Sequence, residues 1–549
     1  MAKSKRSARK PAARSVKGAS RSSHSGGERS RRSAPILRGP KGKGRAAPDG
    51  PYAALREELR QIATLAAVLT NISWDQETQM PPRGASLRAQ QRQMLSAMLH
   101  ERRTSRRFGD LLKAAESWAK KNGDGRIKAD LRETRRDFDL ATRLPTSLVA
   151  ELARCASLGM EAWKEARQKS EFTLFLPWLK RTIELSREKA RCLGVARGGE
   201  LYDPLLDEYE PGMTAAAVKA TFDPLRARLV PLIERVADSS RRPDIAPARV
   251  HTPIELQKAF VRFVCEKIGF DFNAGRVDES THPFCDGFGP GDTRMTNRYR
   301  SDGWADALGT VLHESGHGLY EQGLPKEEHF GSPLAEPISL GIHESQSRMW
   351  ENLIGRSSAF WRWAGTHARK HFAPALDAFT DADIHRAMNI VAPSFIRVES
   401  DELTYNLHIM LRFDLERAMV RQDLSPEDLP GVWNERIKSD LGLDVPDDRR
   451  GCLQDVHWSM GAVGYFPTYT LGNLYSAQFW EAMGREMPGR EEMIARGEFA
   501  PVLQWLRDRV HSVGREFRAE ELCERISGAP LSSDALMRHL ERKVSAVYG

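Results

Sequence analysis

The chain has 549 residues, of which 40% are hydrophobic and 29% charged, and its formal net charge is +9. No run of 18 apolar residues occurs and the N-terminus lacks the apolar core of a secretory signal, so the pattern excludes a membrane-spanning protein and gives no sign of export. The six cysteines are scattered without a C-x-x-C pair, which excludes a disulfide scaffold and a structural zinc site and predicts a reducing, cytoplasmic location.

The positive charge is concentrated in residues 1–50. This segment holds 15 Lys and Arg against Glu28 and Asp49, so it carries +13 and the rest of the chain carries −4. Because it is rich in Ser, Gly, Ala and Pro and nearly free of large apolar residues, we predict a disordered basic tail. Weak contact with nucleic acid and organelle targeting are the alternatives to an inert extension.

Helical periodicity dominates from Pro51 onward. Apolar residues recur at spacings of three and four over Tyr52–Ile72, and similar patterns run through residues 84–122, 127–170 and 214–238. Length alone suggests about three or four domains. Since no Pro-, Gly- or Ser-rich linker interrupts the pattern, we instead predict one large, mainly α-helical catalytic domain over residues 51–549.

Residues 281–301 interrupt the helical pattern. Two short runs flank Gly287, Gly289, Pro290 and Gly291, which is typical of a hairpin or a pair of loops. We expect a small β-sheet here. A sheet beside a catalytic helix would suit an extended peptide, which can pair its backbone with an exposed strand edge.

The segment from Gly303 to Leu324 has the apolar composition of a buried helix and contains the motif H-E-x-x-H. Residues four apart share a helix face, so His313 and His317 can bind one metal ion. Glu314 is rotated by about 100° from His313, which places its carboxylate where it can take a proton from a water activated by the metal. This layout is that of a zincin-like zinc hydrolase, and the buried flanks argue against a chance motif on a surface helix.

Zinc requires a third protein ligand and one open position. The segment Leu334–Ile354 is predicted to be a second helix and holds both His343 and Glu344, which as neighbours cannot face the same ion. We favour Glu344, because two His and one Glu form the set found in zinc peptidases. His343 remains the alternative.

Six motifs follow one another along the chain: HPF (His282–Phe284), DTRMT (Asp292–Thr296), HESGHGLYEQG (His313–Gly323), GIHESQSRMWEN (Gly341–Asn352), IRVESDELTYNLHI (Ile396–Ile409) and GCLQDVHW (Gly451–Trp458). Together with SWDQETQMPPRGASLRAQQ (Ser73–Gln91) and GYFPTYTLGN (Gly464–Asn473), they resemble the carboxypeptidase Taq family of zinc metallocarboxypeptidases. The resemblance spans roughly residues 52–549. Ser400 stands where the family motif I-R-x-x-A-D has Ala, and residues 1–50 have no counterpart.

The resemblance implies a metal site and a set of catalytic residues. It assigns Zn²⁺, with Co²⁺ as a substitute, to His313, His317 and Glu344. It makes Glu314 the general base. It also places His457 and Tyr469 over the metal, where donors can stabilise an oxyanion. Taken without the resemblance, these two would be read as a packed histidine and a core aromatic.

A carboxypeptidase must hold the free C-terminal carboxylate of its substrate. A guanidinium does this best, because it offers paired donors in a planar fork. The resemblance favours Arg397, with Arg294 as the second choice, although either could form a structural ion pair instead. His282 and Asp292 are expected in the substrate cleft or beside a ligand histidine.

The sequence therefore predicts a metallocarboxypeptidase that releases C-terminal amino acids from peptides. A zinc oligopeptidase that cleaves internal bonds is the enzymatic alternative. A nucleic-acid-binding protein with a vestigial metal site is an alternative from another class, and the complete set of metal-site residues argues against it. The resemblance also implies a deep active-site groove and a homodimer.

Overall fold

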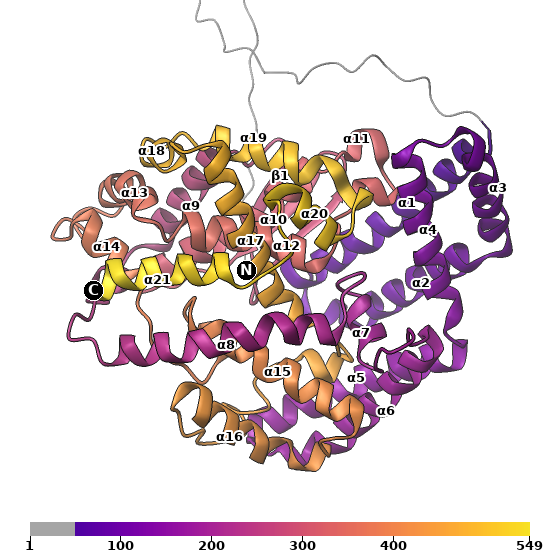
Figure 1. The fold of residues 1–549 in the computed structure, drawn as a ribbon, viewed down its shortest axis with the longest axis horizontal. Helices are drawn as coiled ribbons and strands as arrows, with labels where there is room; N and C mark the ends of the chain where they lie inside the picture. Colours follow the sequence, from indigo (N-terminus) through magenta and orange to yellow (C-terminus); the bar gives the residue numbers. More distant parts are fainter. Residues whose placement is uncertain (1–49) are drawn as a thin grey trace, which may run out of the picture. The chain divides into compact units, whose positions relative to one another are not determined.

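The computed structural model describes residues 50–549 (Figure 1). The predicted basic tail, residues 1–50, lies outside the described residues except for Gly50, so the division into tail and catalytic domain stays a prediction. The described part is mainly helical with one three-stranded sheet, and the predicted fold class is confirmed.

Helices account for most of the described chain. The α-helices are α1 (Pro51–Thr78), α2 (Ala85–Thr104), α3 (Arg106–Asn122), α4 (Gly125–Arg143), α5 (Thr146–Lys169), α6 (Leu176–Leu193), α7 (Asp203–Asp207), α8 (Ala215–Ala237), α9 (Ile254–Ile268), α10 (Trp304–Gly323), α11 (Lys326–His329), α12 (Leu340–Arg348), α13 (Ser358–His371), α14 (Asp381–Ala387), α15 (Thr404–Arg421), α16 (Leu429–Leu441), α17 (Pro467–Glu486), α18 (Arg490–Ala495), α19 (Ala500–Arg509), α20 (Ala519–Ser527) and α21 (Asp534–Tyr548). Short 3-10 helices are η1 (Pro82–Gly84), η2 (Phe172–Leu174), η3 (Ala246–Arg249), η4 (Pro333–Ala335), η6 (Arg397–Glu399), η7 (Pro426–Asp428), η8 (His457–Met460) and η9 (His511–Glu516).

The first helices, α1 to α4, form a hydrophobic core of their own. Leu55, Leu112 and Phe108 are among its buried members. The predicted helical stretch 84–122 is divided into α2 and α3, because Ser105 adopts an extended conformation and its side chain accepts a hydrogen bond from the backbone N–H of Phe108. A serine in this position satisfies a free donor at the start of a helix, so α3 begins there.

The sheet contains the predicted hairpin and one strand that the sequence did not reveal. β2 (Cys285–Gly289) pairs antiparallel with β3 (Asp292–Asn297), and β1 (Gly275–Glu279) pairs parallel with the other side of β3. The strand order β1-β3-β2 leaves β2 at an edge of the sheet. β1 is short and carries Arg, Asp and Glu, so it lacks the apolar alternation that marks a strand.

Helices α10, α12 and α17 pack closely at the centre of the larger core. Two glycines allow this approach. A Cβ on Gly316 of α10 would lie 2.5 Å from the Cα of Ser347, and a Cβ on Gly472 of α17 would lie 2.6 Å from the Cγ of Glu344. Any larger residue at these positions would push α12 away, so the glycines fix where Glu344 stands relative to α10.

Candidate metal centre and active-site cavity

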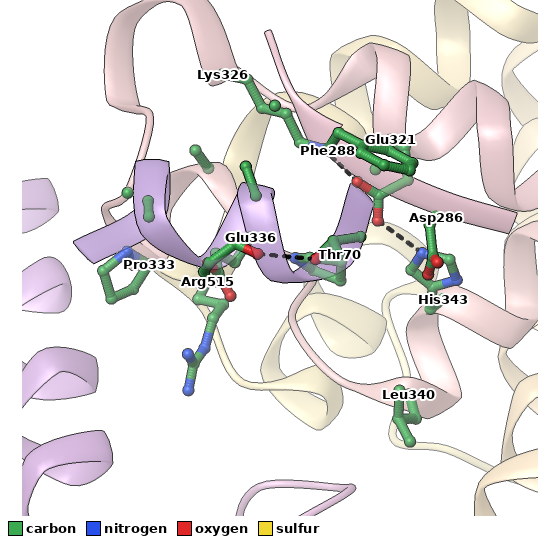
Figure 2. A pocket seen from close by; sticks show the side chains of 18 of the residues that line it. Thr70, Asp286, Phe288, Glu321, Lys326, Pro333, Glu336, Leu340, His343 and Arg515 are labelled. Carbon is green, nitrogen blue, oxygen red and sulfur yellow. Dashed lines mark hydrogen bonds and ion pairs between the residues drawn. The ribbon is translucent and has the colours of Figure 1, made fainter. Parts of the chain in front are cut away.

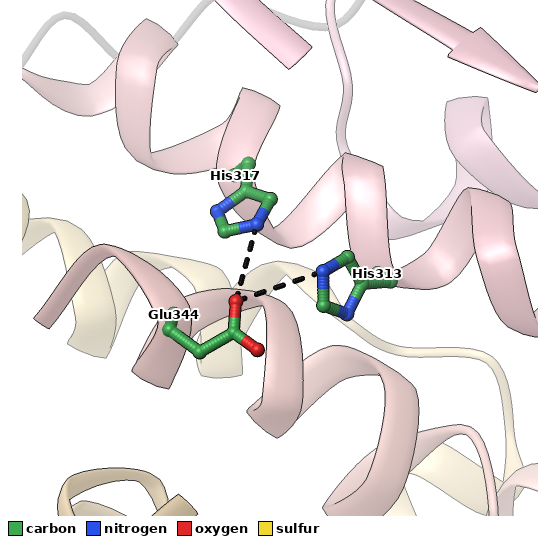
Figure 3. A group of neighbouring side chains, drawn as sticks. All are labelled: His313, His317 and Glu344. Atoms are coloured by element: carbon green, nitrogen blue, oxygen red, sulfur yellow. Dashed lines mark ion pairs between the residues drawn. The ribbon is translucent and has the colours of Figure 1, made fainter. Parts of the chain in front are cut away.

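Three potential ligand side chains meet where α10 passes α12. His313 and His317 lie one turn apart on α10, and Glu344 reaches them from α12 (Figure 3). The Nε2 atom of His313 is 3.6 Å, and that of His317 3.5 Å, from Oε2 of Glu344. The three ligand atoms all lie within 4.8 Å of one another.

The geometry of this group fits a divalent metal ion. Donors that share one tetrahedral ion at about 2.1 Å lie about 3.4 Å from each other, which is close to the two measured separations. Two imidazole nitrogens and one carboxylate oxygen also leave a fourth position for water or substrate. A His-His-Glu metal site is therefore present, and its third member is Glu344 rather than His343.

Two of the three side chains, Glu344 and His317, are held in the protonation state that binds a metal. Burial alone would raise the pKa of Glu344, but the Arg348 guanidinium and the two histidines hold it well below its usual range. The Nε of Arg348 lies 2.7 Å from Oε1 of Glu344, on the side away from the histidines. Burial lowers the pKa of His317 to about 3. An ionised carboxylate and a neutral imidazole are the forms that bind metals.

Glu314 stands beside the three ligands and lines the cavity in front of them. Its side chain is almost fully buried, and this burial raises its pKa to about 7. A carboxylate with a pKa near neutrality can take up a proton and return it within one reaction cycle. The predicted role of Glu314 as general base stays a prediction, which this pKa and the place of Glu314 at the cavity favour.

Each histidine of the group has a hydrogen-bond partner at its second ring nitrogen. Nδ1 of His313 lies 2.9 Å from Oε2 of Glu351, which belongs to the π-helical segment η5 (Met349–Ile354) that continues α12. Nδ1 of His317 lies 2.5 Å from Nδ1 of His343. Glu351 had no predicted role, although its place seven residues after Glu344 on a predicted helix put both on one face.

A cavity of about 900 Å³ opens in front of the metal site and corresponds to the predicted groove. Its lining includes residues of α1, α3, α4, β2, α10, α12 and α17. All of β2 contributes to the lining, so an edge strand runs along the cavity beside the metal site. Figure 2 shows part of this lining, with Asp286 of β2 next to His343 and with Glu336 and Arg515 further away.

His457 and Tyr469 are neighbours at the α17 side of the cavity. Nε2 of His457 lies 3.2 Å from the hydroxyl of Tyr469, and Tyr469 lines the cavity while His457, which is half-buried, is not among the lining residues of the described chain. Burial lowers the pKa of His457 to about 4, so the imidazole is neutral at neutral pH. The structure thus brings together the two residues that the resemblance places over the metal.

Arg397 is buried in contact with Tyr405 and Tyr469, of which Tyr469 lines the cavity. Its Nε donates to Oδ1 of Asp455 (3.0 Å), its Nη1 donates to the hydroxyl of Tyr405 (3.1 Å), and its guanidinium lies 5.0 Å from the ring centre of Tyr469. Asp455 also binds Arg412, so a single carboxylate compensates two buried guanidinium groups. Arg397 is not among the residues that line the cavity in the described chain.

The other three residues predicted to bind substrate lie on or beside the sheet: Arg294 and Asp292 on β3, and His282 between β1 and β2. Arg294 of β3 forms a bidentate pair with Asp292, at 2.8 and 2.7 Å, and its guanidinium stacks on Phe288 and Trp74. His282 is exposed in the segment between β1 and β2. None of Arg294, Asp292 and His282 lines the cavity within residues 50–549, although their neighbours Pro283 and Phe288 do.

Comparison with known proteins identifies the family. The model of the carboxypeptidase Taq (M32) metallopeptidases matches residues 54–544. The chain belongs to this family. The M32 protein is 44% identical over 510 residues to thermostable carboxypeptidase 1 of Thermus thermophilus, an alignment that covers 91% of this chain and 100% of the relative. It is 35% identical to carboxypeptidase 1 of Bacillus subtilis, with 89% and 97% covered.

Solved structures agree with this assignment. The M32 carboxypeptidase of Deinococcus radiodurans superposes with a TM-score of 0.88 at 38% identity and covers 91% of this chain and 100% of its own. The carboxypeptidase of Pyrococcus furiosus gives a TM-score of 0.86 at 34% identity, with 90% and 99% covered.

The protein is accordingly an M32 metallocarboxypeptidase that releases C-terminal residues from peptides. The predicted family, fold class and activity are confirmed. Within residues 50–549, no helix of this M32 chain is long and apolar enough to cross a membrane.

Proposed function

We propose that the protein is a zinc carboxypeptidase in which His313, His317 and Glu344 hold the ion and Glu314 is the general base. The convergence of the three ligand atoms beside Glu314, at the wall of a large cavity, carries this proposal. Co²⁺ would serve as a substitute, since it accepts the same nitrogen and oxygen donors in the same geometry.

Zinc bound here would act as a Lewis acid that polarises the scissile carbonyl and acidifies water. The carboxylate of Glu314 then accepts the proton of the attacking water and passes it to the nitrogen of the leaving amino acid. Arg348 keeps Glu344 ionised, and Glu351 fixes the orientation of the His313 ring through its hydrogen bond to Nδ1.

We assign stabilisation of the developing oxyanion to Tyr469, supported by His457. The Tyr469 hydroxyl lines the cavity and can turn its proton toward a carbonyl oxygen, while the neutral His457 ring 3.2 Å away holds the hydroxyl in place. A donor placed in advance where charge develops lowers the barrier, because no reorganisation is needed during the reaction.

Arg397 is our candidate for binding the substrate carboxylate. A guanidinium carries five N–H groups; those of Arg397 that point to Asp455 and Tyr405 leave one free on Nη1 and one on Nη2. Its neighbour Tyr469 lines the cavity, so the Arg397 guanidinium lies next to a residue of the cavity wall. Arg294 is the second choice, because the stacking and the bidentate pair with Asp292 hold it within the sheet.

We place the peptide along the edge of β2, with Asp292 and His282 supporting the sheet from outside the cavity. Edge strands bind extended peptides through main-chain hydrogen bonds. The whole of β2 lines the cavity, and this supports the placement.

The roles of the metal-site residues are tested by matched variants. We expect His317→Ala to lose bound zinc, measured by metal analysis of the purified protein. Glu314→Gln should keep stoichiometric zinc and lose activity by about 10²–10⁴-fold, because only the proton transfer is removed. Glu336→Gln, a cavity carboxylate away from the ligands, is the control and should retain both. An active Glu314→Gln enzyme would refute the general-base assignment.

The carboxylate anchor is tested with paired peptides that differ only in a free or amidated C-terminus. The native enzyme should strongly prefer the free end. In Arg397→Ala, kcat/KM for the free peptide should fall by an amount equivalent to about 2–4 kcal/mol, because a charged hydrogen-bonded contact is lost. Arg294→Ala is the matched comparison. If Arg294→Ala loses the preference for the free over the amidated C-terminus while Arg397→Ala keeps it, the anchor is Arg294.

We also propose that two copies associate through α2, as the resemblance implies a homodimer. Leu87, Met94 and Met98 lie on one face of α2 and are 61%, 60% and 47% exposed. A stripe of large apolar side chains is normally covered by another surface. Light scattering after size exclusion should give twice the chain mass, and Met94→Glu should give monomers.

Two proposals concern the cellular context. All six cysteines are free, four of them buried, which supports the reducing, cytoplasmic location predicted from the sequence.

Removal of residues 1–49 should leave kcat/KM unchanged within about twofold. Any affinity for nucleic acid should disappear with the tail and should decrease steeply with salt in the full chain.

A further inference from the structure

We propose that His343 and Glu321 are positioning residues for the metal ligand His317. They would fix the tautomer and orientation of its ring through a chain of hydrogen bonds. This inference rests on the proposed role of His317 as a ligand. It gives a function to His343, whose position in the sequence made it an alternative metal ligand, and to Glu321, which had no predicted role.

The chain of contacts runs from the metal site to a buried ion pair. Nδ1 of His343 lies 2.5 Å from Nδ1 of His317, and Nε2 of His343 lies 2.9 Å from Oε1 of Glu321. The other carboxylate oxygen of Glu321 pairs with the ammonium group of Lys326. Figure 2 shows the last two contacts, with the Glu321 carboxylate between Lys326 and His343.

The direction of each hydrogen bond follows from the ligand atom. Nε2 of His317 is the nitrogen near Glu344, so it faces the ion and carries no proton when the metal is bound. The proton of His317 is then on Nδ1, which donates to Nδ1 of His343. His343 must accept at this atom, so its own proton lies on Nε2 and is donated to Glu321. Only one arrangement of protons satisfies all these contacts.

The two ligand histidines differ in this respect. His313 reaches a carboxylate directly, through Glu351, whereas His317 reaches one through an imidazole. The reason is the close contact of α10 and α12. Glu344 and its neighbour His343 leave α12 in different directions, so that one binds the metal and the other binds the ring of His317.

Burial argues that the chain of contacts matters for the metal. The side chains of His317, His343 and Glu321 are 15%, 16% and 10% exposed, so water cannot easily replace a lost partner. Hydrogen bonds to the second nitrogen of a ligand histidine typically change metal affinity by about 10–100-fold. A network that served only stability would leave the affinity unchanged.

The test measures zinc affinity and the tautomer rather than turnover. In His343→Leu, which has no acceptor, the zinc dissociation constant from chelator competition should rise by about 10–100-fold. His343→Asn places an amide oxygen near the position of Nδ1 and should recover most of the affinity. Nitrogen-15 NMR of the zinc-loaded native protein should show the His317 proton on Nδ1.

A matched control separates affinity from structural damage. His511 is another buried histidine whose ring bonds to α12, with Nε2 3.0 Å from Oε1 of Gln346, but it contacts no ligand. His511→Leu should lower the melting temperature without changing zinc affinity. If His343→Leu does not fold, Glu321→Gln is the second variant, because it removes the charge at the end of the chain and should weaken zinc binding.

The outcomes are distinguishable from failure of the proposed metal site. If His317→Ala kept zinc, the ligand assignment itself would be wrong. If His317→Ala lost zinc while His343→Leu and Glu321→Gln both bound it within about threefold of the native constant, only the positioning role would be overturned. A His317 proton found on Nε2 in the zinc-loaded protein would overturn it as well.

Discussion

Two walls of the same cavity are built in different ways. The metal wall consists of α10, α12 and α17, which approach each other at glycines and are joined by side-chain contacts such as that of Glu321 on α10 with His343 on α12. The N-terminal wall, α1 to α4, has a separate hydrophobic core. Polar contacts join it to the rest, among them Ser332 to Asp130 and Arg515 to Asp137.

The difference shows which parts of the cavity must be placed accurately. Metal ligands tolerate errors of only a few tenths of an ångström, and backbone contact at a glycine provides that accuracy because nothing there can adjust. The N-terminal wall lines the part of the cavity that would hold substrate and supplies no metal ligand. Half-buried side chains of α1 can therefore move without displacing His313, His317 or Glu344.

The largest effect should follow from filling a glycine contact in the metal wall. In Gly316→Ala the new methyl would collide with the α12 backbone at Ser347. We expect zinc affinity to fall by more than about 100-fold, since Glu344 moves, and stability to fall by about 3 kcal/mol. Metal titration and thermal unfolding measure both.

Gly309 provides the control on the same helix. A Cβ at this position meets no atom within 4 Å, so Gly309→Ala should be neutral or stabilising by up to about 1 kcal/mol, as for an ordinary helix position. Equal zinc affinity in both alanine variants would contradict the idea that the close approach positions the ligand.

A core deletion in the N-terminal wall should separate stability from metal binding. Leu112 is fully buried among α1, α3 and α4. Leu112→Ala should lower the free energy of unfolding by about 3 kcal/mol through the lost contacts and the remaining cavity. Zinc affinity should stay within about twofold of the native value. A clear loss of zinc would mean that the two walls are coupled.

A pH-dependent effect of similar or smaller size is expected at the start of α12. Glu210 accepts hydrogen bonds from Ser339 and from the backbone N–H of Gly341, and burial raises its pKa from 4.5 to about 7. At a pH between 4.5 and 7, Glu210 keeps its proton in the folded protein but has lost it in the unfolded chain. The free energy of unfolding should therefore decrease as pH rises from 4.5 to 7, by up to about 3 kcal/mol from this group.

The variant Glu210→Gln isolates this contribution, because the amide does not titrate. Denaturant unfolding of both proteins at pH 5 and pH 8 should show a smaller decrease in the variant. Identical pH dependence in the two proteins would mean that Glu210 is already ionised in the folded state.

Local signals in the sequence were sufficient for the ligand-bearing helix. H-E-x-x-H within an apolar run predicts α10 and its two histidines, because both the ligand spacing and the burial follow from one helical period. The third ligand could not be identified from spacing, which allowed His343 as well as Glu344. Only the packing of α12 against α10 decides which of these two neighbours faces the metal site.

Other features depend on contacts between distant segments and could not be predicted. β1 has no apolar alternation and exists because it pairs with β3. Glu321 gains its role from Lys326 and His343, which lie on other elements. The resemblance placed Arg397, His457 and Tyr469 in one region, and the structure brings them together; their roles stay predictions.

The position of β2 has a consequence for how far a peptide can be shortened. A substrate that joins an edge strand offers main-chain groups, which are common to all residues except proline. Digestion would then proceed with little regard to side chains and would pause where a proline reaches a position that must donate an N–H to β2. A peptide with one internal proline would leave a resistant product. The number of residues from that proline to the C-terminus of the product would equal the number between the metal site and the hydrogen bond to β2.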